Sequence, residues 1–488
     1  ASAGFWRRSN DDRTLRNIYP DGFLPFIKSG IVDASFSEGI RGTALGWRWD
    51  LASVYGRNSF AFTIDNSANV SLGPTSKTTF DAGKLAFAQS TTTLDLFRSI
   101  ATPWSAPLRV ALGAEARNDN YRITAGEPDS YRNGQVPVLD ANGNPTTRSA
   151  AVGSQVFPGF QPTDAGDHTR SNTAAYVDLE SDLTRALLVG VAGRVEHYSD
   201  FGTTSTGKVA LRYEPVRRVA LRGAVSSGFR APSLGQEFFS STATNFINGQ
   251  PFDIRTFPVA TPEARLLGAS DLKPERSTNY SAGVALEPLS ALALTVDFYQ
   301  IRIRDRIVLS DNFTGATIQA LFAQTGSTAA GGRFFTNAID TKSNGVDVVA
   351  SCGFDFSSRS NLRLTSSYNH NVVKVTRVDS TPSNLKAFQE TLFGRVERTR
   401  IERGNPRDNF VASGTYSLGG ISLTGRSQRY GEVSVAGTTP TNTTGPLDQT
   451  FGAKWISDAS LSYALRRYTL TVGADNIFDV YPDRNLNP

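Results

Sequence analysis

The residues that most often perform chemistry are few and far apart in this 488-residue chain. Its three histidines, at 168, 197 and 370, show no metal-ligand spacing, and no serine or aspartate motif accompanies them as a catalytic triad would require. The single cysteine, Cys352, excludes an internal disulfide and a cysteine-based zinc cluster. The segment LDANGNP (139–145) resembles a calcium loop but lacks the distal glutamate, which favours a simple turn. The sequence therefore predicts no enzyme, no bound metal and no cofactor.

Arginine and aromatic side chains gather instead in two segments that lack periodic patterning. Loops commonly carry ligand selectivity, and arginine beside aromatic rings suits an anionic, partly aromatic ligand. Packing of one loop against another is the alternative interpretation. The candidate ligand-binding residues are Trp6, Arg7, Arg8 and Tyr19 in the first segment, and Phe238, Phe239, Phe246, Phe252, Arg255 and Phe257 in the second.

The elements that must position these residues are β-strands. From about residue 170 onward apolar and polar residues alternate: Val209, Leu211 and Tyr213 fall on one face, with Ala210 and Arg212 on the other. This period of two is typical of strands with one apolar face. The sequence also predicts strands near 31–45, 48–64, 84–100 and 107–124.

The connections between these strands alternate between short and long. The short ones are 214–218, 287–291, 355–360, 417–420 and 464–467, and the long ones are about 126–170, 230–275, 308–337, 377–406 and 432–453. Short turns at one rim and long loops at the other indicate a bacterial outer-membrane barrel, whereas a soluble sandwich gives no reason for this alternation. The mean hydropathy of −0.27 fits, because lipid-facing and lumen-facing residues average out along each strand.

The chain as a whole predicts an all-β, transmembrane antiparallel barrel with about sixteen strands. The first strand runs toward the short-turn rim, and the last, from Tyr468 to Asp479, runs away from it. Charges are scattered singly along the strands despite a net charge of +5, so the sequence predicts no nucleic-acid partner. The chain starts at Ala1 and contains no methionine, which favours a mature or partial sequence.

The alternation also assigns side chains to the two barrel faces. Aromatic residues expected in the lipid headgroup layer are Tyr213, Tyr280, Trp455, Tyr463 and Tyr468. Charged residues expected to face the lumen are Asp178, Glu180, Arg194, Glu196, Arg212, Glu214, Arg222 and Asp297.

Three further arginines carry a separate prediction. Arg302, Arg304 and Arg306 share the parity of the apolar face, so without a bulge they would point outward beyond the lipid and pair with lipopolysaccharide phosphates. A solvated strand extension is the alternative. Cys352 has apolar-face parity as well and is expected to face lipid.

Several segments together resemble one known family. SGFRAPSLGQEF (227–238), DLKPERSTNYSAGV (271–284), AIDTKSNGVDVVAS (338–351) and WISDASLSYALRRYTLTVGADNIFDVYP (455–482) are similar, in this order, to segments of TonB-dependent receptors. The resemblance covers roughly residues 30–488 and is most specific over 219–287 and 454–482.

The resemblance implies a barrel of the 22-strand type that encloses an N-terminal plug, so that residues 1–488 would be a partial barrel from which the plug domain and the last strand are absent. It implies that the lumen-facing charges hold the plug, that TonB is a partner through that plug, and that the protein lies in the bacterial cell outer membrane.

The function implied is import of a scarce nutrient energised by TonB. A ferric siderophore is the leading small-molecule ligand. TonB-dependent uptake of an oligosaccharide or an aromatic metabolite, and a passive sixteen-stranded porin, are the alternatives.

Overall fold

A computed structural model describes residues 2–3, 5–140, 142–247, 250–327, 329–381, 383–388, 392–437 and 447–486, without the side chains of 2–3, 244–247, 250–252 and 383–384. Its main sheet has 17 strands, of which β1 (Ser2–Ala3) has only two residues. The sixteen long strands are β4 (Phe26–Ala44), β5 (Trp47–Asp65), β6 (Phe80–Ile100), β7 (Leu108–Thr124), β8 (Gly166–Thr184), β9 (Leu187–Tyr198), β10 (Gly202–Val216), β11 (Val219–Arg230), β14 (Glu275–Leu289), β15 (Leu292–Leu309), β18 (Phe335–Ser357), β19 (Ser360–Val378), β20 (Asp408–Leu418), β21 (Ile421–Tyr430), β24 (Lys454–Leu465) and β25 (Tyr468–Ala474). The prediction of about sixteen transmembrane strands is confirmed.

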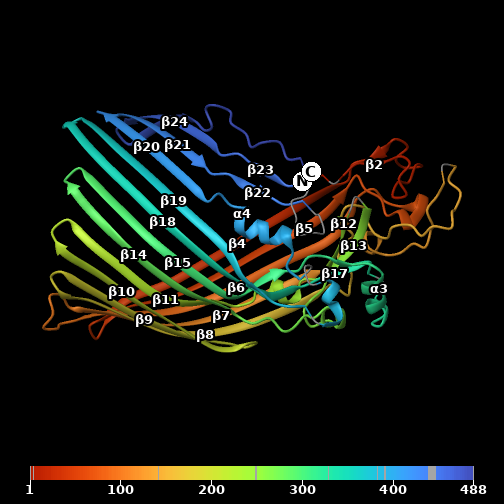
Figure 1. Cartoon of the computed structure of the whole chain (residues 1–488), viewed down its shortest axis with the longest axis horizontal. Helices are drawn as coiled ribbons and strands as arrows, with labels where there is room; N and C mark the ends of the chain where they lie inside the picture. The colour runs from red at the N-terminus through yellow and green to blue at the C-terminus, as the bar shows by residue number, and fades with distance from the viewer. Residues whose placement is uncertain are drawn as a thin grey trace.

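Each long strand pairs antiparallel with the next long strand along the chain, from β4–β5 to β24–β25. The sheet curves into a trough with long, tilted strands (Figure 1). Among the described residues no ladder register joins β25 to β4, so these strands do not close a barrel on their own.

The two rims differ as the loop lengths predicted. One rim carries tight turns such as 45–46, 217–218, 419–420 and 466–467, and the other carries the long connections (Figure 1). Several of these turns place a residue in the left-handed region, including Leu45 (φ 53°), Arg218 (φ 73°) and Arg466 (φ 52°). In an outer-membrane barrel the long-loop rim is the extracellular one.

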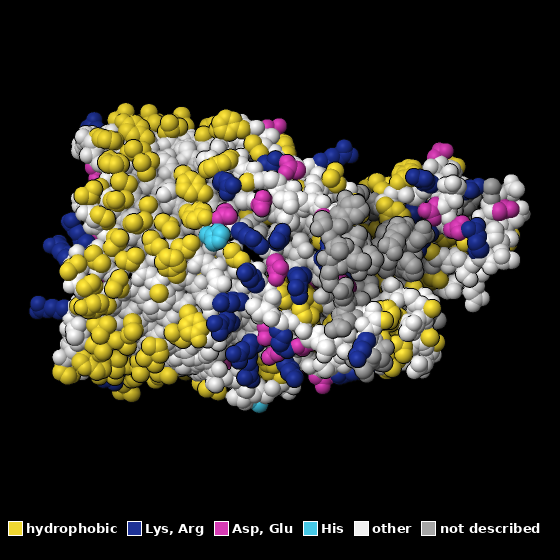
Figure 2. All heavy atoms as spheres, in the orientation of Figure 1, with side chains coloured by type: hydrophobic (Ala, Val, Ile, Leu, Met, Phe, Trp, Pro, Cys, Tyr) yellow, Lys and Arg dark blue, Asp and Glu magenta, His cyan; other side chains and the backbone are white. Residues whose placement is uncertain are grey.

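The outer face of the sheet is apolar around the short-turn half. Large side chains such as Leu461 (52% exposed) and Val225 (50%) form a band there (Figure 2). The five predicted headgroup-layer aromatics belong to it and are between 44% and 74% exposed. Such exposure would be unfavourable in water and is the expected condition of a surface that lipid covers.

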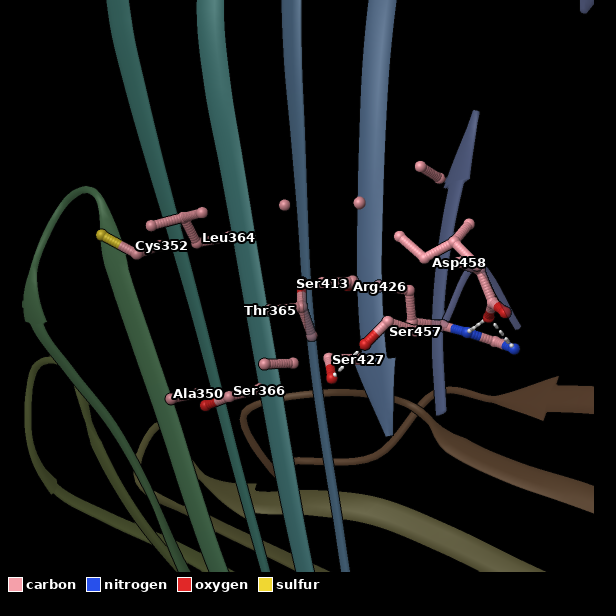
Figure 3. Close-up of a pocket in the computed structure, with 15 residues that line it drawn as sticks. Ala350, Cys352, Leu364, Thr365, Ser366, Ser413, Arg426, Ser427, Ser457 and Asp458 are labelled. Atoms are coloured by element: carbon pink, nitrogen blue, oxygen red, sulfur yellow. Dashed lines mark hydrogen bonds and ion pairs between the residues drawn. The ribbon is translucent and has the colours of Figure 1, made fainter. Parts of the chain in front are cut away.

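One recess interrupts this band across β18, β19, β20, β21 and β24. It has a volume of about 660 Å³, and Ala412 and Gly425 are among the small residues that line it. Figure 3 shows Ala350 and Ser366 at this recess together with Cys352. On its floor the Ser427 and Ser457 hydroxyl groups are 2.9 Å apart. The recess lies on the membrane side of the wall, so Cys352 faces outward as its parity predicted.

The long loops fold into compact structure of their own. A second sheet contains β12 (Ser241–Ile247), β13 (Gln250–Thr256), β17 (Gly331–Arg333) and β16 (Phe313–Thr314), and the neighbouring helices are α2 (Pro262–Leu266), α3 (Ala316–Ala323) and α4 (Arg395–Arg403). Shorter elements are β2 (Arg7–Arg8), β3 (Gly22–Phe23), β22 (Val433–Val435), β23 (Gln449–Phe451), α1 (Leu234–Phe238) and the 3₁₀ turns η1 (Val70–Thr75), η2 (Pro128–Ser130) and η3 (Ser383–Phe388). Phe322, Phe334 and Ile339, all 0% exposed, lie in the largest buried core, which belongs to these loops.

The last strand is shorter than its sequence suggested. Alternation predicted a strand from Tyr468 to Asp479, but β25 ends at Ala474. The Asn476 side chain then closes a turn, donating to the Val480 carbonyl (3.1 Å) and accepting from its N–H (3.0 Å). A local side-chain hydrogen bond here replaces the strand ladder. No helix among the described residues is long and apolar enough to cross a membrane.

Candidate functional site: a polar cavity in the lumen wall

A polar cavity of about 400 Å³ lies on the inner face of the sheet near the extracellular rim. We call it the lumenal cavity. Strands β6 to β9 supply its wall, and the segment after β11 covers one side. Its lining residues are Phe87, Gln89, Glu115, Arg117, Asp119, Arg170, Arg194, Glu196, Tyr198, Phe229, Arg230, Ala231, Pro232, Ser233 and Leu234.

The covering segment is held by helix signals that follow a strand terminator. β11 ends at Arg230, and Pro232 has no N–H with which to extend a ladder. Ser233 then caps α1: its hydroxyl accepts from the Gln236 N–H (3.1 Å), and the Gln236 side chain accepts from the Ser233 N–H (3.0 Å). This capping box directs Leu234, 3% exposed, into a cluster with Tyr121 and other apolar residues.

Arg170 fastens this segment to β8. Its guanidinium, 3% exposed, donates to Asp200 (2.6 Å), to the Pro232 carbonyl (2.6 Å) and to Glu237 (3.1 Å). Burial raises the pKa of Glu237 to about 7, although the charge of Arg170 lowers it. A carboxyl group that takes up a proton near neutral pH therefore lies inside the contact between α1 and the wall.

The floor of the cavity is a chain of charge-assisted hydrogen bonds across three strands. Arg194 donates to Glu196 (2.7 Å) on its own strand and to Glu115 (3.1 Å) on β7. The Tyr198 hydroxyl donates to Glu196 (3.0 Å) and accepts from Arg117 (3.1 Å). Because these groups are largely buried and joined to one another, we expect the wall to be rigid at this point.

Two polar atoms of this network have no hydrogen-bond partner, although the Arg117 Nε lies 3.7 Å from an Asp119 carboxylate oxygen. The Arg117 Nε and the Asn172 Oδ1 are both buried without a hydrogen bond. One needs an acceptor and the other a donor, so a water molecule or a small polar ligand group would satisfy them. The described residues contain no group of three or more His, Cys, Asp or Glu side chains that could hold a metal ion.

The predicted lumen charges lie on the inner face, but they do not converge on one site. Most pair along the wall: Arg222 binds both carboxylate oxygens of Asp297, and Arg212 pairs with Glu214. The Glu180 carboxylate Oε1 lies 2.8 Å from the Arg109 guanidinium Nη2. Asp178 is exposed. Arg194 and Glu196 alone among the predicted set line the lumenal cavity.

The N-terminal ligand candidates divide into exposed and buried residues. Trp6 is 54% exposed and Arg8 is exposed. Arg7 is 0% exposed, and its guanidinium stacks on Phe5 at 3.2 Å and hydrogen-bonds to the Phe5 carbonyl. Burial lowers the pKa of Arg7 and raises the pKa of Tyr19 to about 12. Trp6 and Arg8 are thus the members of this group that a ligand could reach directly.

The second group of candidates is mainly involved in packing. Phe257 is 2% exposed and lies against Phe322 in the loop core, so in this conformation no ligand reaches it. Phe238 stacks on His168 at 3.7 Å, and Arg255 donates to Asp164 at 2.9 Å. Phe239 is half-buried beside Phe160. The side chains of Phe246 and Phe252 lie outside the described residues.

The prediction that Arg302, Arg304 and Arg306 share the outer face is wrong, because a bulge intervenes. Asp305 has φ 53°, and the register shifts between Ile303 and Arg306. Arg302 and Arg304 are exposed and keep outer-face parity. The extra residue places Arg306 opposite Ile339, where it donates to Thr341 (3.4 Å) on the inner side.

Sequence reasoning did not identify five of the seven charged residues that line the cavity, which are Glu115, Arg117, Asp119, Arg170 and Arg230. Glu115, Arg117 and Asp119 occupy alternate positions of one strand, and this alternation of charges would have placed them together on the inner face. Arg170 has no local signal at all. Its importance comes from Glu237 and Pro232, which are more than sixty residues away along the chain.

Comparison with known proteins agrees with this architecture. The model of the family "TonB dependent receptor-like, beta-barrel" matches residues 2–477. A search of curated protein sequences found no match.

Solved structures with the same fold include three bacterial receptors. The siderophore receptor PirA of Acinetobacter baumannii aligns with a TM-score of 0.59 and 13% identity, over 92% of this chain and 59% of PirA. The ferric enterobactin receptor PfeA of Pseudomonas aeruginosa aligns with a TM-score of 0.61 and 14% identity, over 93% and 57%. The ferripyoverdine receptor of the same organism aligns with a TM-score of 0.54 and 13% identity, over 94% and 53%. The chain thus spans a little over half the length of the structures it matches.

Proposed function

Because this chain belongs to the TonB-dependent receptor family of the bacterial outer membrane, we propose that it forms most of the barrel wall of a receptor that imports a ferric siderophore. The observation that carries the proposal is the match to the family's barrel over nearly the whole chain. The fold neighbours named above are receptors for siderophores, which supports this substrate class over the others.

The arrangement of the wall supports transport rather than catalysis. Long loops at the extracellular rim present Trp6 and Arg8, which are exposed, as candidate first contacts for an anionic ligand. Below them the lumenal cavity is lined by polar and charged side chains such as Gln89, Arg117 and Asp119. These groups form a polar route from the loops toward the interior.

TonB would deliver energy through a plug domain held inside this wall. The inner-face ion pairs, such as Arg222–Asp297 and Arg109–Glu180, are partly exposed on both sides. Wet ion pairs of this kind are individually weak, so they can exchange partners with a plug that has to move. Asp178, which is exposed, remains a candidate plug contact, together with the other predicted lumen charges.

The alternative function is that of a passive sixteen-stranded porin, which would not depend on TonB. It would require β25 to pair with β4 into a closed barrel, and among the described residues these strands have no ladder register between them. Uptake of an oligosaccharide or an aromatic metabolite would use the same barrel and differs only in its ligand.

The test is uptake in a strain that lacks its own siderophore receptors and expresses the full-length protein. Radioactive iron bound to catecholate, hydroxamate and mixed-ligand siderophores is the probe, and the same strain without TonB is the control. We expect TonB-dependent accumulation with at least one class. Accumulation that is equal without TonB supports the porin, and TonB-dependent growth on an oligosaccharide without any iron uptake would overturn the siderophore assignment.

A further inference from the structure

Five cations form one patch on the outer wall at the extracellular end of β14, β15, β18 and β19. We call it the outer cationic patch: Arg276, Arg302, Arg304, Lys342 and Lys374. Lys342 lies directly opposite Arg302 in one ladder and opposite Lys374 in the next. Arg304 lies opposite Arg276. Residues directly opposite each other across a ladder share a face, with Cβ atoms about 5 Å apart.

Carboxylates of the described residues do not neutralise the outer cationic patch. Among the described residues, no carboxylate forms an ion pair with Arg276, Arg302, Lys342 or Lys374, and Arg302 donates only to the Gln300 amide (2.9 Å). Like charges directly opposite each other destabilise a sheet. Three adjacent cations therefore weaken the wall unless an external anion neutralises them.

Three carboxylates lie beyond the extracellular edge of the patch and are already paired. Asp340, Asp305 and Asp379 all pair with one arginine, Arg377. The charge of Arg304 also acts on Asp340. The row formed by Arg302, Lys342 and Lys374 lies on the membrane side of this acidic group.

The outer cationic patch lies at the level of the lipid headgroups along the membrane normal. The exposed apolar side chain of Phe298 precedes Arg302 by four residues on β15, a separation of about 13 Å along the strand and about 10 Å along the membrane normal for a typical strand tilt. Figure 2 shows charged side chains in this position, between the apolar band and the loops. This is where the polar layer of an outer leaflet begins.

We propose that the outer cationic patch binds the phosphate groups of a phosphorylated outer-leaflet glycolipid, with Arg302, Lys342 and Lys374 as its central contacts. The lipid holds phosphate next to the wall while its acyl chains cover the apolar band below. Arginine offers two parallel donors to one phosphate, and each lysine adds a point charge. The occupant is a lipid rather than a soluble anion, because the patch opens sideways toward the membrane and not into the lumen.

The test is lipid binding by the delipidated full-length protein in a neutral detergent, followed by native mass spectrometry. The probes are diphosphorylated lipid A, the same lipid without phosphates, and inorganic phosphate. We expect the wild type to prefer the diphosphorylated lipid over both other probes. A cation near an anionic membrane surface contributes about fivefold to binding, so the triple variant Arg302→Gln, Lys342→Gln, Lys374→Gln should bind about 100-fold more weakly.

A matched triple variant controls for net charge. Lys28→Gln, Arg57→Gln and Arg122→Gln remove three outer-face cations from β4, β5 and β7, where Lys28 and Arg122 already pair with carboxylates. We expect its lipid affinity to stay within about twofold of the wild type. An equal loss of lipid affinity in both triple variants would show that only the net charge of the protein matters, and this would overturn the proposal.

Two further results would also overturn it. One is equal binding of the phosphate-free lipid, and the other is inorganic phosphate binding as tightly as the lipid, which would assign a soluble anion. Folding is checked by the thermal midpoint without lipid, which should rise in the patch variant because like charges no longer face each other. The single variant Lys374→Gln, at an exposed position, should bind the diphosphorylated lipid about fivefold more weakly than the wild type. It replaces the triple variant in the test if the triple variant does not fold.

Discussion

The contact between α1 and the wall should weaken as pH rises, and Glu237 should be the cause. Burial raises the pKa of this carboxyl group from its ordinary 4.5 to about 7 when α1 is docked. A docked state that binds the proton more tightly than the released state is favoured at low pH. Docking is therefore strongest below about pH 4.5, is lost progressively as pH rises through about 7, and is weakest above it.

The size of the effect follows from the two pKa values. The full difference of about 2.5 units corresponds to about 3 kcal/mol, of which about 2 kcal/mol falls between about pH 5.5 and about pH 8. This equals roughly a 30-fold change in the opening equilibrium of the segment. Arg170 lowers the pKa of Glu237, so Arg170→Gln should raise that pKa further and leave α1 less firmly held at every pH.

Hydrogen exchange measures this opening directly. The N–H groups of Gln236, Glu237 and Phe239 are hydrogen-bonded within the segment, so their exchange reports its release. Rates are divided by those of the free peptide at each pH to remove the intrinsic pH effect. Protection should fall about 30-fold from pH 5.5 to 8 in the wild type and stay nearly constant in Glu237→Gln.

A nearby histidine provides the control. The ring of His168 stacks on Phe238, and an ordinary imidazole has a pKa of about 6.5. The variant His168→Gln should keep the pH dependence of the wild type. A wild type whose corrected protection is the same at both pH values, or a Glu237→Gln variant that keeps the full slope, would refute the reasoning.

Three further results are expected. Arg194→Ala should lower the free energy of unfolding by about 3 kcal/mol, because Glu115 and Glu196 are largely buried and both lose their ion pair with Arg194. Arg222→Ala should lower it by less than about 1 kcal/mol, because the Arg222–Asp297 pair is more exposed to solvent. Both values are measured by thermal unfolding. Phe322→Ala should destabilise the loop core by about 3 to 5 kcal/mol, seen as faster proteolysis of the loops while the strands stay protected. A spin label on Cys352 in bilayers should collide more with oxygen than with a water-soluble nickel chelate, and the reverse order would place it in the lumen.

Much of the wall could be predicted from sequence because strand patterning is a local rule. Side chains alternate between faces at every residue, so Leu211 and Arg212 were assigned to opposite faces correctly. Loop lengths then identified the rims, and the family resemblance placed the chain in the outer membrane. The S-x-x-Q pattern at 233–236 also marks the start of α1, a signal that the loop prediction for this segment overlooked.

The site could not be predicted to the same extent, because its contacts depend on the register of distant strands. A single extra residue at Asp305 moved Arg306 to the inner side, and no periodic pattern reveals a bulge. Phe257 and Trp6 have similar loop contexts in sequence, yet one is buried in the loop core and the other is 54% exposed.

The sequence alone determined the class of the molecule: an antiparallel outer-membrane barrel with charges on its inner face. Only the tertiary structure decided which charges meet. Arg170 holds Glu237 because β8 and the end of β11 approach each other in space, and Arg302, Lys342 and Lys374 form a row because two ladders set their register. Alternation is a property of each strand by itself, whereas a site or a patch is a property of the register between strands.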